Sequence, residues 1–391
     1  MNIFTDKAPV TITCHKRIAT YLQQEVTALG FEIEEVFVTG VRIHASINEC
    51  IKLNLNLRCA SQVLYSIKQF SATDGDDIYK NVVNYPWENI LPDDGYFSIT
   101  SNVSNDTINN NLYANLRVKD GIVDRMRDKT GKRPASGSEL TGAVFNLFWK
   151  QHEAEIFIAT SGNSLARHGY RKIPGLAPML EALATAAIYA TKWDRSSPFI
   201  NPMCGSGTIA IEAALIATNR RPGLFRTNYA FMHLRGYDDS VYIKEDSLLE
   251  EQIKDIPGLR IIATDYSERA IENAKKNAIA AGVAKLIDFA VCDFADTEVP
   301  LHQAGVVLLN PEYGERLGQI AELEATYARI GDFMKKRCEG YYGYIFTGNL
   351  NLAKKMGLRA SRKIEFYNST IDCRLLEYEL YKGSRESQKQ V

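Results

Sequence analysis

Apolar and polar positions in the first sixty residues follow two different patterns. Residues 9–14, 32–38 and 41–46 alternate between apolar and polar side chains, as half-buried strands do. Residues 15–29 and 47–58 instead place apolar side chains three and four positions apart, as amphipathic helices do. The pattern predicts a small module in which strands and helices share one core.

Strand and helix patterns continue less regularly up to residue 160. Residues 62–69, 96–102 and 153–159 carry strand patterns, and residues 78–84 carry a helical one. The first module has the strand and helix order of a ferredoxin-like unit, so this half of the chain is predicted to be α+β.

A Gly- and Pro-containing segment at 162–178 marks a domain boundary, after which strands and helices alternate. The expected strands span residues 199–203, 260–264, 287–292, 306–309 and 341–347, with helices at 179–191, 209–215, 267–281 and 320–336. The last two strands, 363–367 and 374–381, follow one another without a helix between them. A mostly parallel sheet that ends in an antiparallel hairpin is the Rossmann-like architecture of class I methyltransferases, whereas a dinucleotide dehydrogenase would continue to alternate.

Composition places limits on the class of protein. The chain has 391 residues, enough for two or three domains, and its 45% hydrophobic and 24% charged residues are ordinary for a globular protein. The net charge of −1 means that any nucleic-acid surface is a local patch. Single, scattered cysteines predict free thiols, and the sequence shows neither a leader peptide nor a membrane-length apolar run, so a cytoplasmic location is expected.

The most basic part of the chain is residues 115–172. Eleven Lys and Arg stand there against six Asp and Glu, a surplus of five positive charges. Such a surplus suits phosphate binding, since cationic side chains release counterions from nucleic acid. Charge alone leaves open, and even favours, a solvated helix face with no ligand.

Residues 197–215, SPFINPMCGSGTIAIEAAL, combine a buried strand, a turn with two glycines and an Ala-rich helix. Gly205 and Gly207 let the backbone bend and approach a ligand, and the N–H groups at the start of the helix favour an anion. A turn that merely closes a loop would have the same composition.

Three further strand ends carry polar residues, and carboxyl ends of parallel strands meet at one edge of a sheet. Asp265 ends the second strand, where it could accept hydrogen bonds from ribose hydroxyls. Asp293 and Phe294 end the third, where a carboxylate could accept from an adenine amino group beside an aromatic ring. Each Asp could instead cap a helix or form a turn.

The fourth strand ends in Asn310-Pro311-Glu312-Tyr313. An exocyclic amino group is a poor nucleophile because its lone pair is delocalised into the base. The Asn310 amide oxygen and the Pro311 carbonyl could accept its two protons and direct the lone pair at a methyl group, while Tyr313 stacks on the base. This chemistry needs no metal.

These motifs resemble a known family. NPMCGSGTIAIEAA, ATDYSERAIENAKKNA and NPEYGERLG resemble the amino-methyltransferase group of class I S-adenosylmethionine (SAM)-dependent enzymes. NDTINNNLYANLRVKDGIVDRM and SGNSLARHGYRKIPGLAPMLEALA resemble the bacterial THUMP-domain 23S rRNA guanine-N2 methyltransferases. The resemblance covers nearly the whole chain and implies RNA binding by the N-terminal half and methyl transfer to guanine N2 of 23S rRNA by the rest. It also implies a ferredoxin-like module at 1–56, a THUMP domain at 57–162 and a methyltransferase domain at 163–383. The polar composition of residues 384–391 predicts a disordered tail.

The resemblance carries roles to single residues. The cofactor would be bound by Asn201, Pro202, Cys204, Gly205, Ser206, Gly207, Thr208, Asp265, Tyr266, Asp293 and Phe294. The catalytic residues would be Asn310, Pro311 and Tyr313, and RNA would contact Lys119, Arg125, Lys132, Arg133 and Arg171. Glu312 is added to the catalytic residues because of its position in the same turn.

Two positions depart from the family pattern: Asn201 stands where Asp is usual, and Glu312 where a second Pro is usual. We consider two roles for Glu312: its carboxylate could accept from guanine N1–H and favour guanine over adenine, or it could point to solvent. Some relatives carry a second methyltransferase domain after the first, and we expect this chain to lack it.

Other functions remain open at this stage. The same chemistry on a tRNA guanosine uses the same domain plan, and an RNA-binding assembly factor with a degraded site would explain Asn201 and Glu312. A nicotinamide-dependent dehydrogenase fits less well, because the hairpin and Asn310-Pro311 have no role there. We expect no membrane or metal partner, and a monomer in preference to an oligomer.

Overall fold

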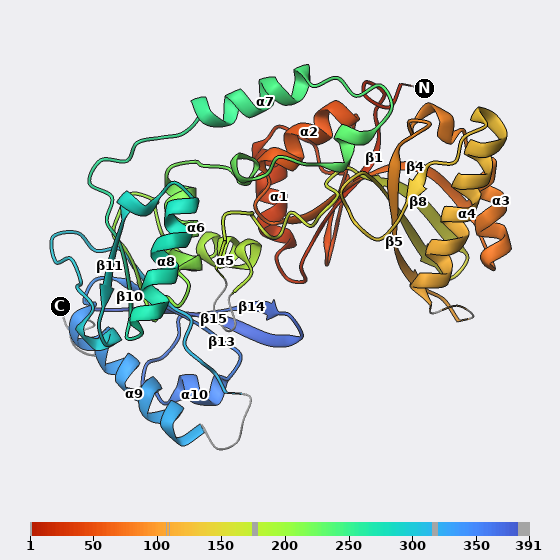
Figure 1. Ribbon diagram of the computed structural model, residues 1–391. Helices are drawn as coiled ribbons and strands as arrows, with labels where there is room; N and C mark the ends of the chain where they lie inside the picture. The colour runs from red at the N-terminus through yellow and green to blue at the C-terminus, as the bar shows by residue number, and fades with distance from the viewer. Residues whose placement is uncertain (1, 107, 109, 174–178, 315–319, 382–391) are drawn as a thin grey trace. The chain divides into compact units, whose positions relative to one another are not determined.

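The computed structural model of the protein describes residues 2–106, 108, 110–173, 179–314 and 320–381, and the predicted disordered tail lies outside them. The chain forms two compact units (Figure 1). The first comprises Met1–His15, Leu22–Leu165 and Pro222–Glu251, and the second comprises Lys16–Tyr21, Ala166–Arg221 and Gln252–Val391. All seven cysteines are free, as predicted. In the described part of the chain, no helix has the length and apolar character needed to cross a membrane.

The first unit is built on one eight-stranded sheet, in the order β2-β3-β1-β4-β8-β7-β5-β6. Its strands are β1 (Ala8–Cys14), β2 (Glu35–Phe37), β3 (Gly40–Ala45), β4 (Ala60–Ser71), β5 (Tyr96–Ser104), β6 (Ala135–Ser136), β7 (Ala143–Lys150) and β8 (Glu153–Ala159). β4 pairs antiparallel with β1 on one edge and with β8 on the other. The two N-terminal modules therefore share a single sheet. The sequence pattern did not indicate this, because alternation along one strand does not say what pairs with its two edges.

Helices of the first unit begin and end at recognisable signals. They are α1 (Ala19–Ala28), α2 (Ile47–Asn56), α3 (Gly75–Val83), α4 (Asn111–Thr130) and α7 (Ser240–Glu251), with short 3-10 turns η1 (Trp87–Asn89), η2 (Pro222–Phe225) and η3 (Ala230–His233). Ser46 and Glu49 form a reciprocal capping box at the start of α2. The Asn110 side chain caps α4, and Gly131 ends it in the left-handed conformation, with φ of 71°.

Residues 222–251 return to the first unit from within the second half of the chain. The predicted domains followed one another along the sequence, whereas this part of the range 163–383 clusters with the first unit in the structure. Packing explains it: Leu249 of α7 is buried, and a Cβ built on Gly223 would lie 2.8 Å from the side chains of both Leu55 and Leu249. The returning segment is therefore closely packed on the end of α2.

The second unit contains a seven-stranded sheet in the order β11-β10-β9-β12-β13-β15-β14. Its strands are β9 (Phe199–Pro202), β10 (Ile261–Asp265), β11 (Ile287–Val291), β12 (Val306–Leu309), β13 (Tyr342–Thr347), β14 (Arg362–Asn368) and β15 (Ile371–Glu379). The pairs from β11 to β13 are parallel, whereas β15 is antiparallel to both β13 and β14. The predicted parallel sheet with a terminal antiparallel hairpin is confirmed.

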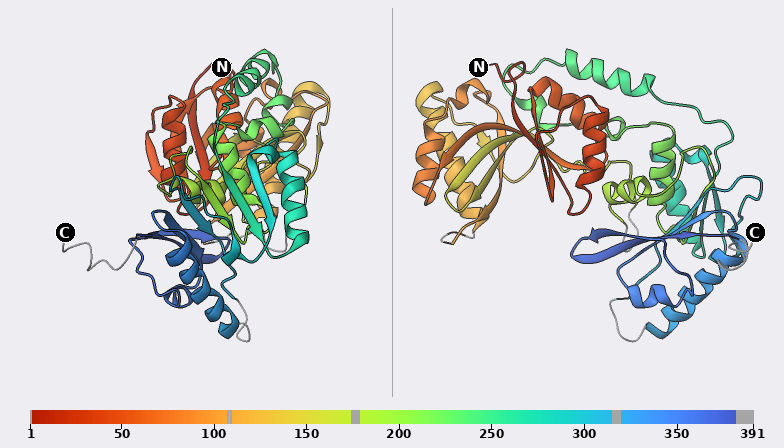
Figure 2. Two further views of the ribbon diagram at one scale, coloured as in Figure 1. Left: turned by 90° about the vertical axis from the view of Figure 1, so that its left-hand side faces the viewer. Right: turned by 180° about the vertical axis from the view of Figure 1, so that it is seen from behind.

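Helices cover both faces of this second sheet (Figures 1 and 2). One face carries α5 (Glu181–Tyr189), α6 (Thr208–Ala217) and α8 (Glu268–Ala280), and the other face carries α9 (Ile320–Arg337) and α10 (Leu350–Lys354). The short 3-10 turns η4 (Ala284–Leu286) and η5 (Phe294–Asp296) lie in the connections. A buried cluster joins Val307 and Leu309 of the sheet to Tyr327 and Phe333 of α9. Every residue of α6 is buried, so the helix after the glycine turn lies within the core.

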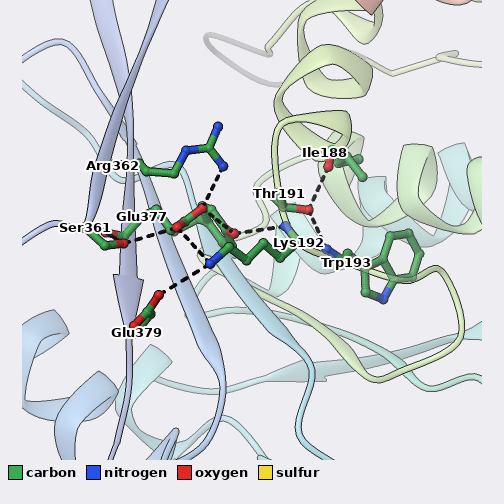
Figure 3. A network of polar contacts seen from close by, with 9 residues as sticks. Ile188, Thr191, Lys192, Trp193, Ser361, Arg362, Glu377 and Glu379 are labelled. Atoms are coloured by element: carbon green, nitrogen blue, oxygen red, sulfur yellow. Dashed lines mark hydrogen bonds and ion pairs between the residues drawn. The ribbon is translucent and has the colours of Figure 1, made fainter. Parts of the chain in front are cut away.

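A buried carboxylate fastens the terminal hairpin to the sheet (Figure 3). Glu377 of β15 is fully buried and accepts from Tyr344 Oη of β13 at 3.0 Å and from Arg362 Nη1 of β14 at 3.2 Å. Lys192, which follows α5, pairs with the same carboxylate at 3.4 Å. Three chain segments thus meet at one charge, and cations and a hydroxyl replace the water that burial removes.

Candidate active site

Four neighbouring parallel strands, β11, β10, β9 and β12, bring their carboxyl ends to one edge of the second sheet. The glycine turn follows β9, Asp265 ends β10, Asp293 follows β11, and Asn310 follows β12. Strand order therefore gathers the four strand ends that the sequence singled out. Ligands of open parallel sheets bind at such an edge.

The glycine turn has the backbone conformation that its sequence suggests. Gly205 has φ of 55° and Gly207 has φ of 83°, both in the left-handed region where a side chain is disfavoured. A Cβ on Gly207 would lie 2.9 Å from the Ala274 side chain of α8, whereas one on Gly205 would meet nothing within 4 Å. Gly207 is thus required for close packing, and Gly205 leaves open space beside the turn.

Asp265 connects the ends of β9 and β10. Its Oδ2 accepts from the Gly205 backbone N–H at 3.0 Å, and its Oδ1 accepts from the Ser267 N–H at 3.0 Å. Ser267, not Asp265, caps α8. Asp265 is 9% exposed, and each of its carboxylate oxygens can accept a further hydrogen bond from a hydroxyl.

A small cavity lies between the ends of β10 and β11. It has a volume of about 160 Å³ and is lined by Met203, Asp265, Tyr266, Asp293, Phe294, Thr326 and Arg329. Asp293 accepts from the Ala295 N–H at 2.9 Å and from Arg329 Nη2 at 2.7 Å. Burial would raise the pKa of the Asp293 carboxyl, but these two donors prevail and hold that pKa below its usual range. The cavity thus presents carboxylates and two aromatic side chains together.

Two amide oxygens near the adjoining ends of β9 and β12 have no hydrogen-bond partner within the described residues: Asn201 Oδ1 and Asn310 Oδ1, both buried. The amide nitrogen of Asn201 donates to the Leu308 carbonyl at 2.8 Å, which ties β9 to β12. A carboxylate at position 201 could not make this bond while ionised. A buried acceptor without a donor costs free energy, so both oxygens are suited to a ligand donor.

The turn after β12 holds its aromatic residue by two side-chain amides. Asn368 Nδ2 of β14 donates to Tyr313 Oη at 2.9 Å, and Asn349 Nδ2 donates to the Tyr313 carbonyl at 3.4 Å. Pro311 is buried, whereas the Glu312 side chain is exposed. The structure thus fixes Tyr313 and leaves Glu312 accessible.

The other predicted cofactor residues are mostly enclosed. Pro202, Ser206, Thr208 and Cys204 are buried, and burial raises the pKa of the Cys204 thiol. Tyr266 is 78% exposed at the mouth of the cavity.

Arg171 is not placed as an RNA-binding residue would be. Its guanidinium donates to the Met179 carbonyl at 2.6 Å and to Thr208 Oγ1 at 2.9 Å, and it pairs with Glu181 at 3.4 Å. Only 12% of the side chain is exposed. These contacts hold the start of α6 and leave little of the Arg171 guanidinium accessible for the predicted RNA contact. The sequence could not show that its partners lie within its own unit.

The remaining predicted RNA-binding residues belong to the first unit. Arg125 of α4 forms a two-pronged ion pair with Glu88, at 3.0 Å and 2.5 Å, and this carboxylate raises the pKa of Arg125. Lys119 pairs with its neighbour Asp120 at 3.2 Å. Lys132 and Arg133 are exposed just beyond the end of α4. These last two are the most accessible cations of the predicted set.

Sequence analysis missed three residues of the cavity, Met203, Thr326 and Arg329. Met203 has φ of 56°, which the sequence does not reveal. Thr326 and Arg329 lie three positions apart on one face of α9, a spacing that gives no indication of what the face meets. Asn368, which holds Tyr313, lies just after the predicted strand 363–367 and was given no role there.

Comparison with family models divides the chain into three parts. A model described as the RMKL-like methyltransferase domain matches residues 168–377, and a THUMP domain model matches residues 72–139. A model described as the RlmL ferredoxin-like domain matches residues 10–64.

Individual relatives agree with these models. The chain is 35% identical over 383 residues to a Syntrophotalea carbinolica protein named ribosomal RNA large subunit methyltransferase K/L, covering 94% of this chain and 53% of that protein. It is 30% identical over 373 residues to slr0064 of Synechocystis, a proposed RNA methyltransferase, covering 95% of this chain and 97% of that protein. The chain spans about half the length of the K/L proteins that it matches.

The fold also has close counterparts among solved structures. SMU.472, a proposed methyltransferase whose structure is a complex with SAH, superposes with a TM-score of 0.88 at 25% identity, over 97% of this chain and 100% of that chain. The second unit accordingly has the class I methyltransferase fold that the sequence predicts.

Proposed function

The chain belongs to the family of RMKL-like methyltransferase domains with an attached THUMP domain, and we propose that it transfers a methyl group from SAM to the exocyclic N2 amino group of a guanosine in 23S rRNA. The names of its K/L relatives support the rRNA substrate, and the complex of SMU.472 with SAH supports the cofactor. The choice of an exocyclic amino group over a ring nitrogen rests on the turn after β12.

The residues of the strand-end edge fit SAM. The open side of Gly205 and the start of α6 would receive its carboxylate, Asp265 its ribose and Asp293 its adenine amino group. The buried, unpartnered oxygen of Asn201 is a further acceptor beside them. When bound, SAM supplies an electrophilic methyl group on a sulfonium.

One observation carries the assignment of the nucleophile: Asn310 Oδ1 is buried without a partner in the described chain, directly before Pro311 and Tyr313. An exocyclic amino group has two N–H donors, and Asn310 Oδ1 and the Pro311 carbonyl oxygen are two hydrogen-bond acceptors. A ring nitrogen such as guanine N7 carries no proton and would leave the Asn310 oxygen unpaired. The anchored Tyr313 would stack on a base taken out of its helix.

RNA binding is assigned to the first unit, which includes the THUMP match. Lys132 and Arg133 supply accessible positive charge there, and neutralising RNA phosphates contributes to affinity in a salt-dependent way.

The proposal is tested by incubating the purified protein with labelled SAM and unmodified 23S rRNA, followed by nuclease digestion and mass spectrometry of the nucleosides. We expect N2-methylguanosine. N7-methylguanosine as the product would refute the assignment of an amino group, whereas N6-methyladenosine would retain the amino group and refute the choice of guanine. Methylation of tRNA with none of 23S rRNA would refute the substrate while retaining the chemistry.

A further inference from the structure

Arg329 of α9 reaches the end of β11 and contacts both residues that the proposed function assigns to the adenine end of SAM. Its Nη2 donates to Asp293 Oδ1 at 2.7 Å, and its guanidinium carbon lies 4.9 Å from the centre of the Phe294 ring. The Phe294 ring in turn packs edge-on against Phe333, one helical turn further along α9. A charged, planar group is therefore fixed at this site by an ion pair on one side and an aromatic ring on another.

The contact with Asp293 leaves part of that carboxylate available. Arg329 and the Ala295 N–H both use Oδ1, so Oδ2 has no donor among the residues that the structure describes. The cavity of about 160 Å³ exists with Arg329 in this position, and Arg329 lines it together with Tyr266. The guanidinium is thus one wall of an open space and does not fill it.

We propose that Arg329 determines affinity for the adenine end of the cofactor, by stacking its guanidinium on the base while Asp293 Oδ2 accepts from the amino group of the base. This inference rests on the proposed function. Guanidinium groups are planar, weakly hydrated and stack well on aromatic faces, whereas a lysine ammonium is a compact charge that cannot stack. Tyr266, exposed on the same cavity, offers the base an aromatic partner.

The anchoring at Asp293 strengthens the effect. Arg329 is 54% exposed along its side chain, so without a fixed partner it would lose conformational freedom when a base stacks on it. Because Asp293 and Phe294 already hold it, little further ordering is needed on binding. The same exposure means that replacing Arg329 removes little buried packing and should leave the fold intact.

Isothermal titration of S-adenosylhomocysteine and of adenosine tests this inference in wild type, Arg329→Ala, Arg329→Lys and the control Lys336→Ala. Lys336 is on the same helix, is 71% exposed and pairs only with Asp332 in the contacts described. We expect Arg329→Ala to weaken binding of both ligands by about three- to thirty-fold, the range of a cation–π contact. Arg329→Lys should recover less than half of that loss in free energy, and Lys336→Ala should match wild type.

The outcomes separate the inference from the function on which it rests. Equal or tighter binding by Arg329→Ala would overturn the inference, because tighter binding would show that the guanidinium occupies the place of the base. Full recovery by Arg329→Lys would also overturn it, since charge alone would then suffice. Absence of S-adenosylhomocysteine binding by the wild-type protein would instead refute the proposed function.

Discussion

Asn310→Ala should remove activity without destabilising the protein. Asn310 Oδ1 is a buried acceptor with no partner among the described residues, so the folded state bears the cost of its lost hydration. A buried acceptor left unpaired costs about 1–3 kcal/mol. Alanine removes that cost together with a small amount of packing, so we expect the free energy of unfolding to stay the same or rise by up to about 2 kcal/mol.

Whereas the stability of Asn310→Ala should stay the same or increase, its methylation rate should fall. If Asn310 Oδ1 accepts a hydrogen bond from the amino group, this hydrogen bond strengthens as positive charge develops on the nitrogen. Removing one such preorganised group typically lowers kcat by about 10²–10³-fold. Binding of S-adenosylhomocysteine should be unchanged, because Asn310 lies on the side of the target base in this assignment.

Thermal unfolding and single-turnover methylation measure the two effects on the same preparations. In a domain of this size, 1 kcal/mol corresponds to about 2–4 °C in the unfolding midpoint. Asn349→Ala is the reference for stability only, because the Asn349 side chain accepts from the Asn351 and Leu352 N–H groups and caps α10. Its methylation rate is not compared, since the same side chain also holds the Tyr313 carbonyl. Loss of that cap should cost about 0.5–2 kcal/mol. If Asn310→Ala is destabilised as much as Asn349→Ala, the oxygen of Asn310 has a partner in the fold and the reasoning is wrong.

Three further predictions follow from the described contacts. Glu377→Ala should lower the free energy of unfolding by about 1–3 kcal/mol in denaturant titration, since it leaves the buried Tyr344 hydroxyl without its acceptor. The 43% exposed Glu379→Ala should have little effect, and similar losses for both would contradict this. The double variant Lys132→Glu/Arg133→Glu should weaken binding of 23S rRNA fragments and reduce the slope of log affinity against log salt by about 2. Binding of S-adenosylhomocysteine should be retained. An unchanged slope would mean that neither residue contacts RNA phosphates. Glu312→Pro should reduce the ratio of kcat/KM for guanosine to kcat/KM for 2-aminopurine at the target position by about tenfold or more. The reason is that 2-aminopurine keeps the amino group but lacks the N1–H from which Glu312 would accept a hydrogen bond. An unchanged ratio would place Glu312 in solvent.

Local elements were predictable because their signals are local. The strands at 153–159 and 306–309 were predicted with the bounds that β8 and β12 have. The helix at 267–281 differs from α8 by one residue at each end, and the helix at 320–336 differs from α9 by one residue at its C-terminal end. Apolar periodicity is set by neighbours within a few positions, so it can be recognised in sequence. Helix α7 was not predicted, since it buries only Leu249 among its described residues and so has almost no apolar stripe. Strand β7 was not predicted either.

The arrangement of elements required pairing information that the sequence does not contain. β4 joins two modules into one sheet because both its edges are paired, and residues 222–251 return to the first unit because Leu249 and Gly223 pack against Leu55. Such contacts depend on which surfaces meet after folding and not on any periodicity along the chain.

By itself, the sequence determined the sheet-and-helix alternation, the glycine turn and the polar residues at the four strand ends, because each depends on a few consecutive residues. Only the tertiary structure decided which charges are engaged. Arg171 is held inside its own unit by Thr208 and Glu181, while Arg329 lies 36 positions from Asp293 yet shares its carboxylate. The sequence alone does not show whether a Lys or Arg binds RNA, caps a helix or lines a cavity. The partner that folding brings to within about 3–4 Å of its charged group determines which of these roles it has.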